Sequence, residues 1–199
     1  MNDSLRIAVA DDEPDMRDYF QKILPRLGHK VVAAARDGVE LVARCRDLQP
    51  DLVITDIKMP EMDGIDAAVQ INQERPVPII LVSAYSDATL VERAERDHIL
   101  GYLVKPIKQA DLGPTIALVM RRFEQFQALS QEAADLREAL EHRQTIERAK
   151  GLLMKERSLD EQQAFQCLQE LARSQKCKLV DVAKAALANK SSLPPAKES

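Results

Sequence analysis

The chain has 199 residues, of which 45% are hydrophobic and 30% are charged, and its formal net charge is −4 at pH 7. This composition is typical of a folded globular protein and argues against global disorder, and the length suits one domain of ordinary size plus a smaller module. The acidity belongs to residues 1–122, which hold 16 Lys and Arg against 20 Asp and Glu, whereas residues 123–199 hold 12 of each.

Residues 1–122 alternate short apolar runs with amphipathic stretches. The runs that predict strands lie at 6–10, 30–35, 51–55, 78–83 and 102–104. The stretches that predict helices lie near 14–25, 38–48, 64–74, 87–97 and 108–122. The residues before Thr55 are apolar at consecutive positions, as expected of a strand that is covered on both faces. The order predicts an α/β domain with a five-stranded, parallel, doubly wound (flavodoxin-like) sheet.

A long helix is predicted to leave this domain from about Leu112. No Gly or Pro occurs between Thr115 and Lys150, and the segment is rich in Ala, Leu, Glu, Gln and Arg. Its apolar residues recur in steps of three and four with one three-residue slip in phase: Ile116, Val119, Phe123, Phe126, Leu129, Ala133, Leu136 and Leu140. This spacing permits a coiled coil, which we expect over residues 115–140.

Two shorter helices are predicted after Gly151. Ser158 and Glu161 have the spacing of a capping box, in which each side chain satisfies the other residue's backbone amide. The apolar face of the first helix contains Phe165, Leu168, Leu171 and Ala172, and that of the second contains Leu179, Val182, Ala183, Ala186 and Leu187. With the end of the long helix they predict a small all-α module of three helices at 136–189, followed by a disordered tail at 190–199.

Acidic side chains follow two of the predicted strands. Asp11 and Asp12 come after the first strand and Asp56 comes after the third, and the carboxyl ends of parallel strands share one crevice. Carboxylate oxygens without His or Cys suit a hard cation, and we expect Mg²⁺. Ser83 ends the fourth strand and Lys105 the fifth, which adds a hydroxyl donor and a positive charge. Such a site could hold a phosphoryl group, and an ionised aspartate needs no general base to accept one.

Five short motifs strengthen this interpretation: ADDE at 10–13, DIKMP at 56–60, DG at 63–64, SA at 83–84 and YLVKP at 102–106. Together they resemble the receiver domains of two-component systems, over residues 5–122, and we place the receiver domain at 1–122. The resemblance implies that Asp56 accepts phosphate from a histidine kinase. It also implies that Asp12, Asp56 and the backbone carbonyl of Lys58 bind Mg²⁺, with Asp11 acting through water.

The same resemblance assigns roles to residues near the ends of the last two strands. Lys105 and Ser83 would contact the phosphoryl oxygens. Tyr102 matches the aromatic switch residue, whose ring turns inward when the Ser83 hydroxyl moves toward the phosphate. The bond between Lys105 and Pro106 is expected to be cis. Lys58 and Tyr85 occupy positions that tune the lifetime of the phosphate in receivers.

The C-terminal third carries a second resemblance. Residues 136–154, 159–165 and 179–183 resemble the antitermination regulator (ANTAR) domain, which implies a three-helix output that binds RNA hairpins in nascent transcripts. Gly151 and Met154 match the motif, without an expected contact to RNA. The basic residues that we expect to contact RNA are Arg143, Arg148, Lys150, Lys155, Arg157, Lys176 and Lys178. A cluster of Lys and Arg on a helix is also typical of a solvated helix face.

These patterns predict a phosphorylation-controlled, RNA-binding transcription antiterminator that is not an enzyme and forms a homodimer at least when phosphorylated. A DNA-binding response regulator is an alternative, although the last helices lack clear helix-turn-helix spacing. A helical output that only recruits proteins is another, and so is an enzyme that uses Asp56 as a nucleophile on outside substrates.

The compartment is predicted from what the chain lacks. The first 15 residues have no basic start and no continuous apolar stretch, and no run of 18 apolar residues occurs anywhere. We therefore expect a cytoplasmic protein without membrane contact. Cys45, Cys167 and Cys177 are odd in number and show no paired spacing, so we expect reduced, structural thiols.

Overall fold

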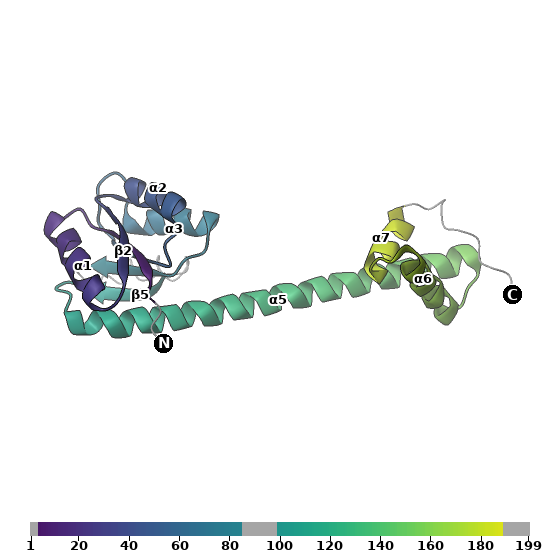
Figure 1. Cartoon of the computed structure of the whole chain (residues 1–199). Coiled ribbons are helices and arrows are strands. Elements are labelled where there is room, and N and C mark those ends of the chain that lie inside the picture. The colour runs from purple at the N-terminus through teal and green to yellow at the C-terminus, as the bar shows by residue number, and fades with distance from the viewer. Residues whose placement is uncertain (1–3, 85–98, 189–199) are drawn as a thin grey trace. The chain divides into compact units, whose positions relative to one another are not determined.

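We analysed a computed structural model of the chain, which describes residues 4–84 and 99–188 (Figure 1). The chain divides into two compact units, Met1–Gln127 and Ala128–Ser199. The helix predicted at 87–97, the side chain of Tyr85 and the predicted disordered tail at 190–199 lie outside the described residues.

The first unit is the predicted α/β domain. Its elements are β1 (Arg6–Ala10), α1 (Pro14–Arg26), β2 (Lys30–Ala35), α2 (Gly38–Leu48), β3 (Leu52–Asp56), α3 (Gly64–Glu74), β4 (Ile79–Ser83) and β5 (Ile99–Val104). The strand order is β2-β1-β3-β4-β5 and every pairing is parallel. This confirms the doubly wound, flavodoxin-like sheet.

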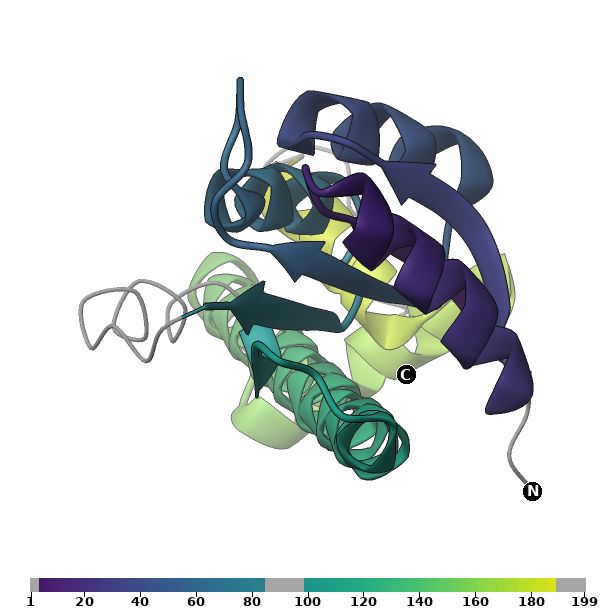
Figure 2. The ribbon, with the colours of Figure 1, turned by 90° about the vertical axis from the view of Figure 1, so that its left-hand side faces the viewer.

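Helices cover both faces of the sheet, as the view in Figure 2 shows. On one face, α2 and α3 pack Leu41 and Ala68 against Val53 of β3. On the other face, α1 and the start of α5 pack Phe20 and Leu112 against the sheet. Because β1, β3 and β4 lie inside the sheet and are covered on both faces, most of their residues are apolar, and all of them except Arg6 are buried.

Strand β5 begins at Ile99, three residues before the predicted start at Tyr102. Its first half includes Gly101, which weakens the apolar pattern of the sequence. The structure supplies a reason for this glycine, since a Cβ at position 101 would lie 2.4 Å from Cγ2 of Val119 in α5. The glycine therefore allows the edge strand and the helix to pack closely.

Helix α5 (Gln109–Arg157) unites the helix predicted at 108–122 with the long helix predicted beyond it. Ile116, Val119 and Phe123 are buried in the first unit. From residue 124 to residue 141 every residue is exposed, including Leu129 and Leu136 of the predicted coiled coil. The residues that the structure describes therefore leave Leu129 and Leu136 largely exposed to solvent.

The second unit is a module of three helices, as predicted. The end of α5 packs with α6 (Glu161–Gln175) and α7 (Leu179–Ala188) around a small core. The buried members of this core are Ala149, Leu153, Ala164, Leu168, Val182, Ala183 and Ala186. All but one of the residues that the sequence places on the apolar faces of α6 and α7 belong to this core or pack against it; Phe165 is half-buried.

The predicted capping box of α6 is wrong by two residues. Asp160 is the N-cap: its Oδ1 accepts a hydrogen bond from the amide of Gln163 at 2.7 Å, and the Gln163 side chain accepts one from the amide of Asp160 at 3.0 Å. Ser158 lies before the helix with φ 55°, and Glu161 is its first residue and instead pairs with Lys150. Both pairs of residues have the capping spacing, and the backbone selects the second.

Candidate functional site

The site lies at the carboxyl ends of the parallel strands. Asp11 and Asp12 directly follow β1, and Asp56 is the last residue of β3. One carboxylate oxygen from each of the three lies within 4.8 Å of the others. Asp11 and Asp56 are buried, whereas Asp12 is exposed. The sheet therefore brings together three acidic residues that are up to 45 positions apart in the sequence.

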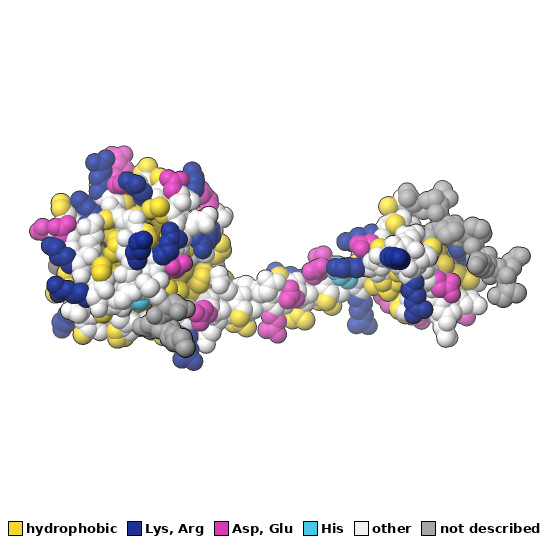
Figure 3. All heavy atoms as spheres, in the orientation of Figure 1, with side chains coloured by type: hydrophobic (Ala, Val, Ile, Leu, Met, Phe, Trp, Pro, Cys, Tyr) yellow, Lys and Arg dark blue, Asp and Glu magenta, His cyan; other side chains and the backbone are white. Residues whose placement is uncertain are grey.

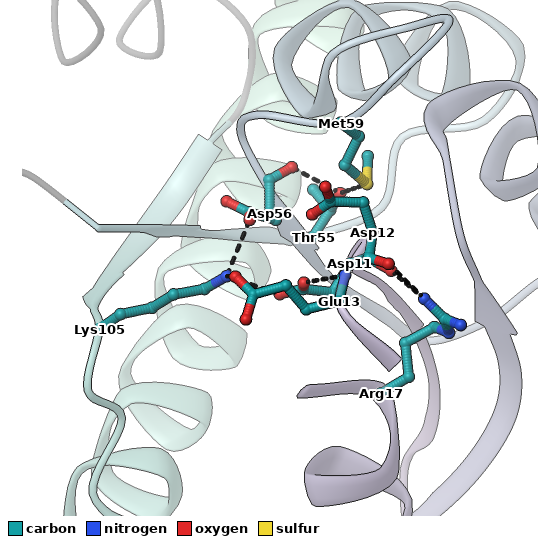
Figure 4. Close-up of polar contacts among 8 residues, drawn as sticks. All are labelled: Asp11, Asp12, Glu13, Arg17, Thr55, Asp56, Met59 and Lys105. Atoms are coloured by element: carbon teal, nitrogen blue, oxygen red, sulfur yellow. Dashed lines mark hydrogen bonds and ion pairs between the residues drawn. The ribbon is translucent and has the colours of Figure 1, made fainter. Parts of the chain in front are cut away.

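Lys105 supplies the positive charge of the site. It follows the last residue of β5, and its Nζ lies 2.9 Å from Oδ2 of Asp56 and 3.0 Å from Oδ2 of Asp11 (Figure 4). The peptide bond between Lys105 and Pro106 is cis, as the resemblance implies. The lysine thus bridges the two buried carboxylates.

The electrostatics of the site depend on the balance between burial and pairing. Burial raises the pKa of Asp11 above its usual value, and the hydrogen bond and charge of Lys105 offset only part of this effect. For Lys105, burial alone would lower the pKa, but the hydrogen bond that it donates to Asp56 and its ion pair with Asp11 outweigh burial and raise the pKa. Lys105 therefore stays protonated at neutral pH.

Two residues of the site were not predicted. Oε1 of Glu13 lies 3.3 Å from Nζ of Lys105, and the amide of Glu13 donates a hydrogen bond to Oδ1 of Asp11 at 3.0 Å. Arg17 of α1 donates to the backbone carbonyls of Asp11 at 2.7 Å and Asp12 at 3.0 Å. Arg17 fixes the loop that carries both aspartates. An arginine one turn into the helix after an acidic loop is the sequence signal that could have indicated it.

Three other predicted residues lie on or next to the strands β3, β4 and β5. Ser83, the last residue of β4, is buried, and Tyr102 in β5 is half-buried against the apolar core on the side of α2 and α3. The strands place Ser83 beside Val104 and Leu81 beside Tyr102. Lys58 follows β3, and its side chain is exposed. The two switch candidates therefore lie on neighbouring strands.

Gly64 holds the first turn of α3 against the end of β3. A Cβ at this position would lie 2.0 Å from the backbone oxygen of Asp56, and the Gly64 amide donates to the carbonyl of Ile57 at 2.9 Å. Asp63 caps the helix, because its Oδ1 accepts a hydrogen bond from the amide of Asp66 at 2.7 Å. The DG motif thus fixes the backbone of Asp56 by close packing.

The donor set suits a hard divalent cation. Three carboxylates converge, and no His or Cys belongs to the cluster. Oδ2 of Asp11 is buried, accepts no hydrogen bond of good geometry from the described residues and contacts Nζ of Lys105. Such an oxygen is available to a water molecule or an ion in the crevice, and Mg²⁺ prefers few carboxylates with retained waters. The residues present therefore fit Mg²⁺.

The basic residues of the helical module fall into two groups. Arg143, Arg148 and Lys155 are exposed on the last part of α5, and Lys176 and Lys178 are exposed between α6 and α7. Arg157 is half-buried, with its guanidinium 4.0 Å from Sγ of Cys167. Figure 3 shows several Lys and Arg side chains on the visible face of this module.

Lys150 differs from the other predicted RNA-contacting residues because its side chain is buried in the module. Its Nζ lies 2.7 Å from Oε1 of Glu161 and 3.0 Å from Oε2 of Glu147, and 5.8 Å from the ring centroid of Phe165. The ion pairs with the two glutamates raise the pKa of Lys150. In this structure Lys150 connects α5 to the start of α6 and is not part of the exposed basic surface.

Two family models match the chain. The response regulator receiver domain matches residues 7–117, and the ANTAR domain matches residues 134–186. The first match covers more than half of the chain. The protein therefore belongs to the response regulators of two-component systems, with a receiver domain followed by an ANTAR domain.

A relative that shares both parts is the transcriptional regulatory protein PdtaR of Mycobacterium tuberculosis. It is 41% identical over 182 residues, which cover 92% of this chain and 89% of the relative. The protein-glutamate methylesterase/protein-glutamine glutaminase of Haloarcula marismortui is 44% identical over 87 residues, but these cover only 24% of that enzyme. The similarity to the enzyme is therefore limited to part of it, whereas the similarity to the regulator extends over nearly the whole protein.

Solved structures match the receiver. The signal receiver domain of the putative response regulator NarL from Mycobacterium tuberculosis has a TM-score of 0.57 and 26% identity, covering 60% of this chain and 98% of that one. A chain of the CheX–CheY–BeF₃–Mg²⁺ complex from Borrelia burgdorferi has a TM-score of 0.54 and 25% identity, covering 56% of this chain and 85% of that one.

Among the described helices, none combines the length and apolar character needed to cross a membrane.

Proposed function

We propose that a histidine kinase phosphorylates this response regulator on Asp56 and that phosphorylation controls an RNA-binding output that acts in transcription antitermination. The observation that supports the proposal most strongly is the contact of Lys105 with both Asp56 and Asp11, in a chain that also carries an ANTAR domain. Such a regulator would act on nascent transcripts in the cytoplasm.

The chemistry assigned to Asp56 is a single phosphoryl transfer. A carboxylate oxygen of Asp56 attacks the phosphorus of a phosphohistidine, the new P–O bond forms as the P–N bond breaks, and the released imidazole takes a proton from water. Lys105 keeps its own proton and places its charge beside the transferred oxygens. Catalysis of this step requires positioning and neutralisation of charge, which the pair of Asp56 and Lys105 supplies.

Mg²⁺ is the proposed cofactor. Asp11, Asp12, Asp56 and the backbone carbonyl of Lys58 are the groups that would hold it, with Asp11 acting through water. The bound ion would neutralise the charge of the phosphoryl oxygens. The similarity to a chain of the CheX–CheY complex, which contains Mg²⁺ and BeF₃, supports this choice.

Signal transmission is assigned to Ser83 and Tyr102. In the proposed switch, the Ser83 hydroxyl moves toward the phosphoryl group and the ring of Tyr102 turns into the space that is left. Phosphorylation can change the output only by stabilising one of two states more than the other. We propose that the favoured state has a larger population of dimers.

RNA binding is assigned to the exposed basic residues of the helical module. Arg143, Arg148, Lys155, Lys176 and Lys178 are exposed and could reach phosphates, and half-buried Arg157 lies near them in sequence. The described part of the module has no exposed aromatic residue for base stacking, because Phe165 is half-buried. Recognition would therefore depend on the phosphate backbone and the shape of a hairpin.

The phosphorylation step is tested by labelling with a small acyl-phosphate donor. We expect the intact mass of the wild type to increase by one phosphoryl group when Mg²⁺ is present, and we expect Asp56→Asn to abolish this increase without loss of fold. Asp18→Asn is a matched control, since Asp18 is exposed on α1 and, among the residues that the structure describes, pairs with Lys22 alone, at 4.0 Å. Labelling that persists in Asp56→Asn would show that the acceptor is another residue.

RNA and DNA outputs are separated by competition. We expect the phosphorylated protein to bind a hairpin RNA in preference to scrambled RNA and to duplex DNA at physiological salt. Arg148→Ala with Lys155→Ala should weaken binding and reduce its dependence on salt by about two units of slope at most. Preference for duplex DNA would support the DNA-binding alternative.

The enzymatic alternative receives no support from the relatives, because the methylesterase matches over a quarter of its length and the regulator over most of its own. We propose that Asp56 takes up one phosphoryl group for each chain and has no outside substrate. Steady multiple turnover of a phosphoester, dependent on Asp56, would contradict this.

A further inference from the structure

Glu13 is a carboxylate of the site to which the proposed phosphoryl transfer gives no role. It is the N-cap residue of α1, and its side chain caps no amide among the described residues of that helix. Oε1 of Glu13 lies 3.3 Å from Nζ of Lys105, the same atom that lies 2.9 Å from Oδ2 of Asp56. Figure 4 shows both carboxylates beside this nitrogen. Lys105 is therefore shared between the proposed acceptor and a carboxylate outside the proposed set of Mg²⁺ ligands.

The exposure of these side chains places Glu13 on the solvent side of the site. The side chain of Glu13 is 62% exposed, whereas those of Lys105 and Asp56 are 15% and 9% exposed. A phosphodonor reaches Asp56 from solvent, so it approaches past the exposed carboxylate. Charges in such a position act on the rate of approach of a charged molecule more than on the strength of its final contacts.

The contact between Glu13 and Lys105 contributes little to folding, because an ion pair with so exposed a partner is weakened by solvent and salt. Lys105 also has two buried partners, Asp56 and Asp11, that hold it in place without Glu13. The negative charge of Glu13 has two effects on an incoming phosphoryl group: it repels the group, and it competes with the group for Lys105. Both effects increase with the negative charge of the donor.

Phosphodonors differ in this charge. An acyl phosphate is a dianion at neutral pH. In phosphoramidate the nitrogen is protonated, which offsets one charge of the phosphoryl group, and the imidazole ring of a phosphohistidine can carry a proton in the same way. The repulsion between a fixed carboxylate and a donor is proportional to the net charge of the donor. A carboxylate at the entrance therefore slows acyl phosphates more than donors with a P–N bond.

We propose that Glu13 is a specificity-determining residue, which disfavours free acyl phosphates relative to phosphohistidine as donors to Asp56. This inference rests on the proposed phosphorylation of Asp56. In each reaction a carboxylate oxygen of Asp56 attacks phosphorus and forms a new P–O bond. With an acyl phosphate, the P–O bond to the acyl group breaks and a carboxylate leaves with the electron pair. With phosphoramidate, the P–N bond breaks and ammonia leaves. Glu13 gives and takes no proton in either reaction.

The proposal is tested by labelling the full chain with acetyl phosphate and with phosphoramidate. The second-order rate constants are measured by intact mass, at low ionic strength and at saturating Mg²⁺ for each variant. Unit charges about 7 Å apart in water change a rate constant about threefold. Glu13→Gln should therefore speed labelling by roughly tenfold with the doubly charged acetyl phosphate and by about threefold with phosphoramidate. In 1 M salt, where the Debye length is about 3 Å, most of this difference between the donors should disappear.

Two control variants separate the charge from the structure. Glu13→Asp keeps the charge and should keep the wild-type ratio of the two rate constants. Asp18→Asn removes a negative charge from an exposed position further along α1 and should also leave the ratio unchanged. Equal effects of Glu13→Gln on both donors, or no effect on either, would overturn the inference and leave the labelling of Asp56 standing. A wild type that neither donor labels on Asp56 would instead refute the proposed function, and the inference with it.

Discussion

Replacement of Gly64 by alanine tests how the end of β3 is held in place. The added Cβ would lie 2.0 Å from the backbone oxygen of Asp56 and 3.1 Å from Oγ1 of Thr55. An ordinary contact between carbon and oxygen is about 3.3 Å, so α3 and β3 must separate locally by roughly 1 Å. The obstacle is backbone in a buried strand, which cannot move aside as a flexible side chain can.

The expected cost follows from this overlap. Overpacking a buried site costs about 1–3 kcal/mol, and a clash with backbone belongs at the upper end. For a domain of this size, about 3 kcal/mol corresponds to a decrease of about 12 °C in the melting temperature. We also expect slower labelling of Asp56, because the displaced residue is the proposed acceptor itself.

Calorimetry and acyl-phosphate labelling of Gly64→Ala measure both effects. Gly151→Ala is the matched control, because Gly151 lies in helix α5 and a Cβ there meets no atom within 4 Å. It should leave labelling unchanged and stabilise the protein by up to about 1 kcal/mol. If Gly64→Ala melted with the wild type and were labelled at the same rate, the close packing of α3 on Asp56 would be refuted.

Three further substitutions test other parts of the structure. Asp11→Asn should raise the melting temperature at neutral pH in the absence of divalent metal. Burial raises the pKa of Asp11 in the folded state, so the ionised carboxylate destabilises the fold above the unfolded pKa. The difference in melting temperature between the variant and the wild type should vanish below pH 3.8, and a stabilisation that persists there would contradict this reasoning. Asp160→Ala should destabilise the helical module by about 1 kcal/mol in denaturant titrations, whereas Ser158→Ala should not, and the reverse order would restore the original capping prediction. Lys176→Gly should stabilise the same module by about 0.5–1 kcal/mol, because Lys176 has φ 51° at the end of α6 and glycine adopts this left-handed conformation without strain. A loss of stability would mean that the Lys176 side chain stabilises the module by more than its backbone conformation costs.

The sheet and its acidic crevice were predictable because the fold constrains the sequence there directly. Strands covered on both faces must be apolar at consecutive positions, and the carboxyl ends of parallel strands must meet, so Asp11 and Asp56 could be placed together from their spacing. The contribution of Glu13 was not predictable, and the position of Arg17 after an acidic loop indicated its role only as one possibility, since a polar residue near a helix start has the same appearance whether it is solvated or bound to a loop.

In the helical module, the roles of some residues depend on the fold and could not be predicted from residue type and spacing. Lys150 occurs in a basic run, and only the fold shows that two glutamates surround it, one of them on another helix. Ser158 and Asp160 both have the spacing of an N-cap, and the choice depends on backbone angles that the residue types do not determine. In contrast, the apolar residues of α7 have one helical period and were placed correctly in the core.

Control of RNA binding by Asp56 is tested by the affinity for a hairpin RNA, measured before and after treatment of one sample with an acyl phosphate and Mg²⁺. Treatment should strengthen RNA binding by the wild type and by Asp18→Asn and should leave the binding of Asp56→Asn unchanged. Equal affinity of the treated and untreated wild type, or binding no stronger than to scrambled RNA, would contradict it.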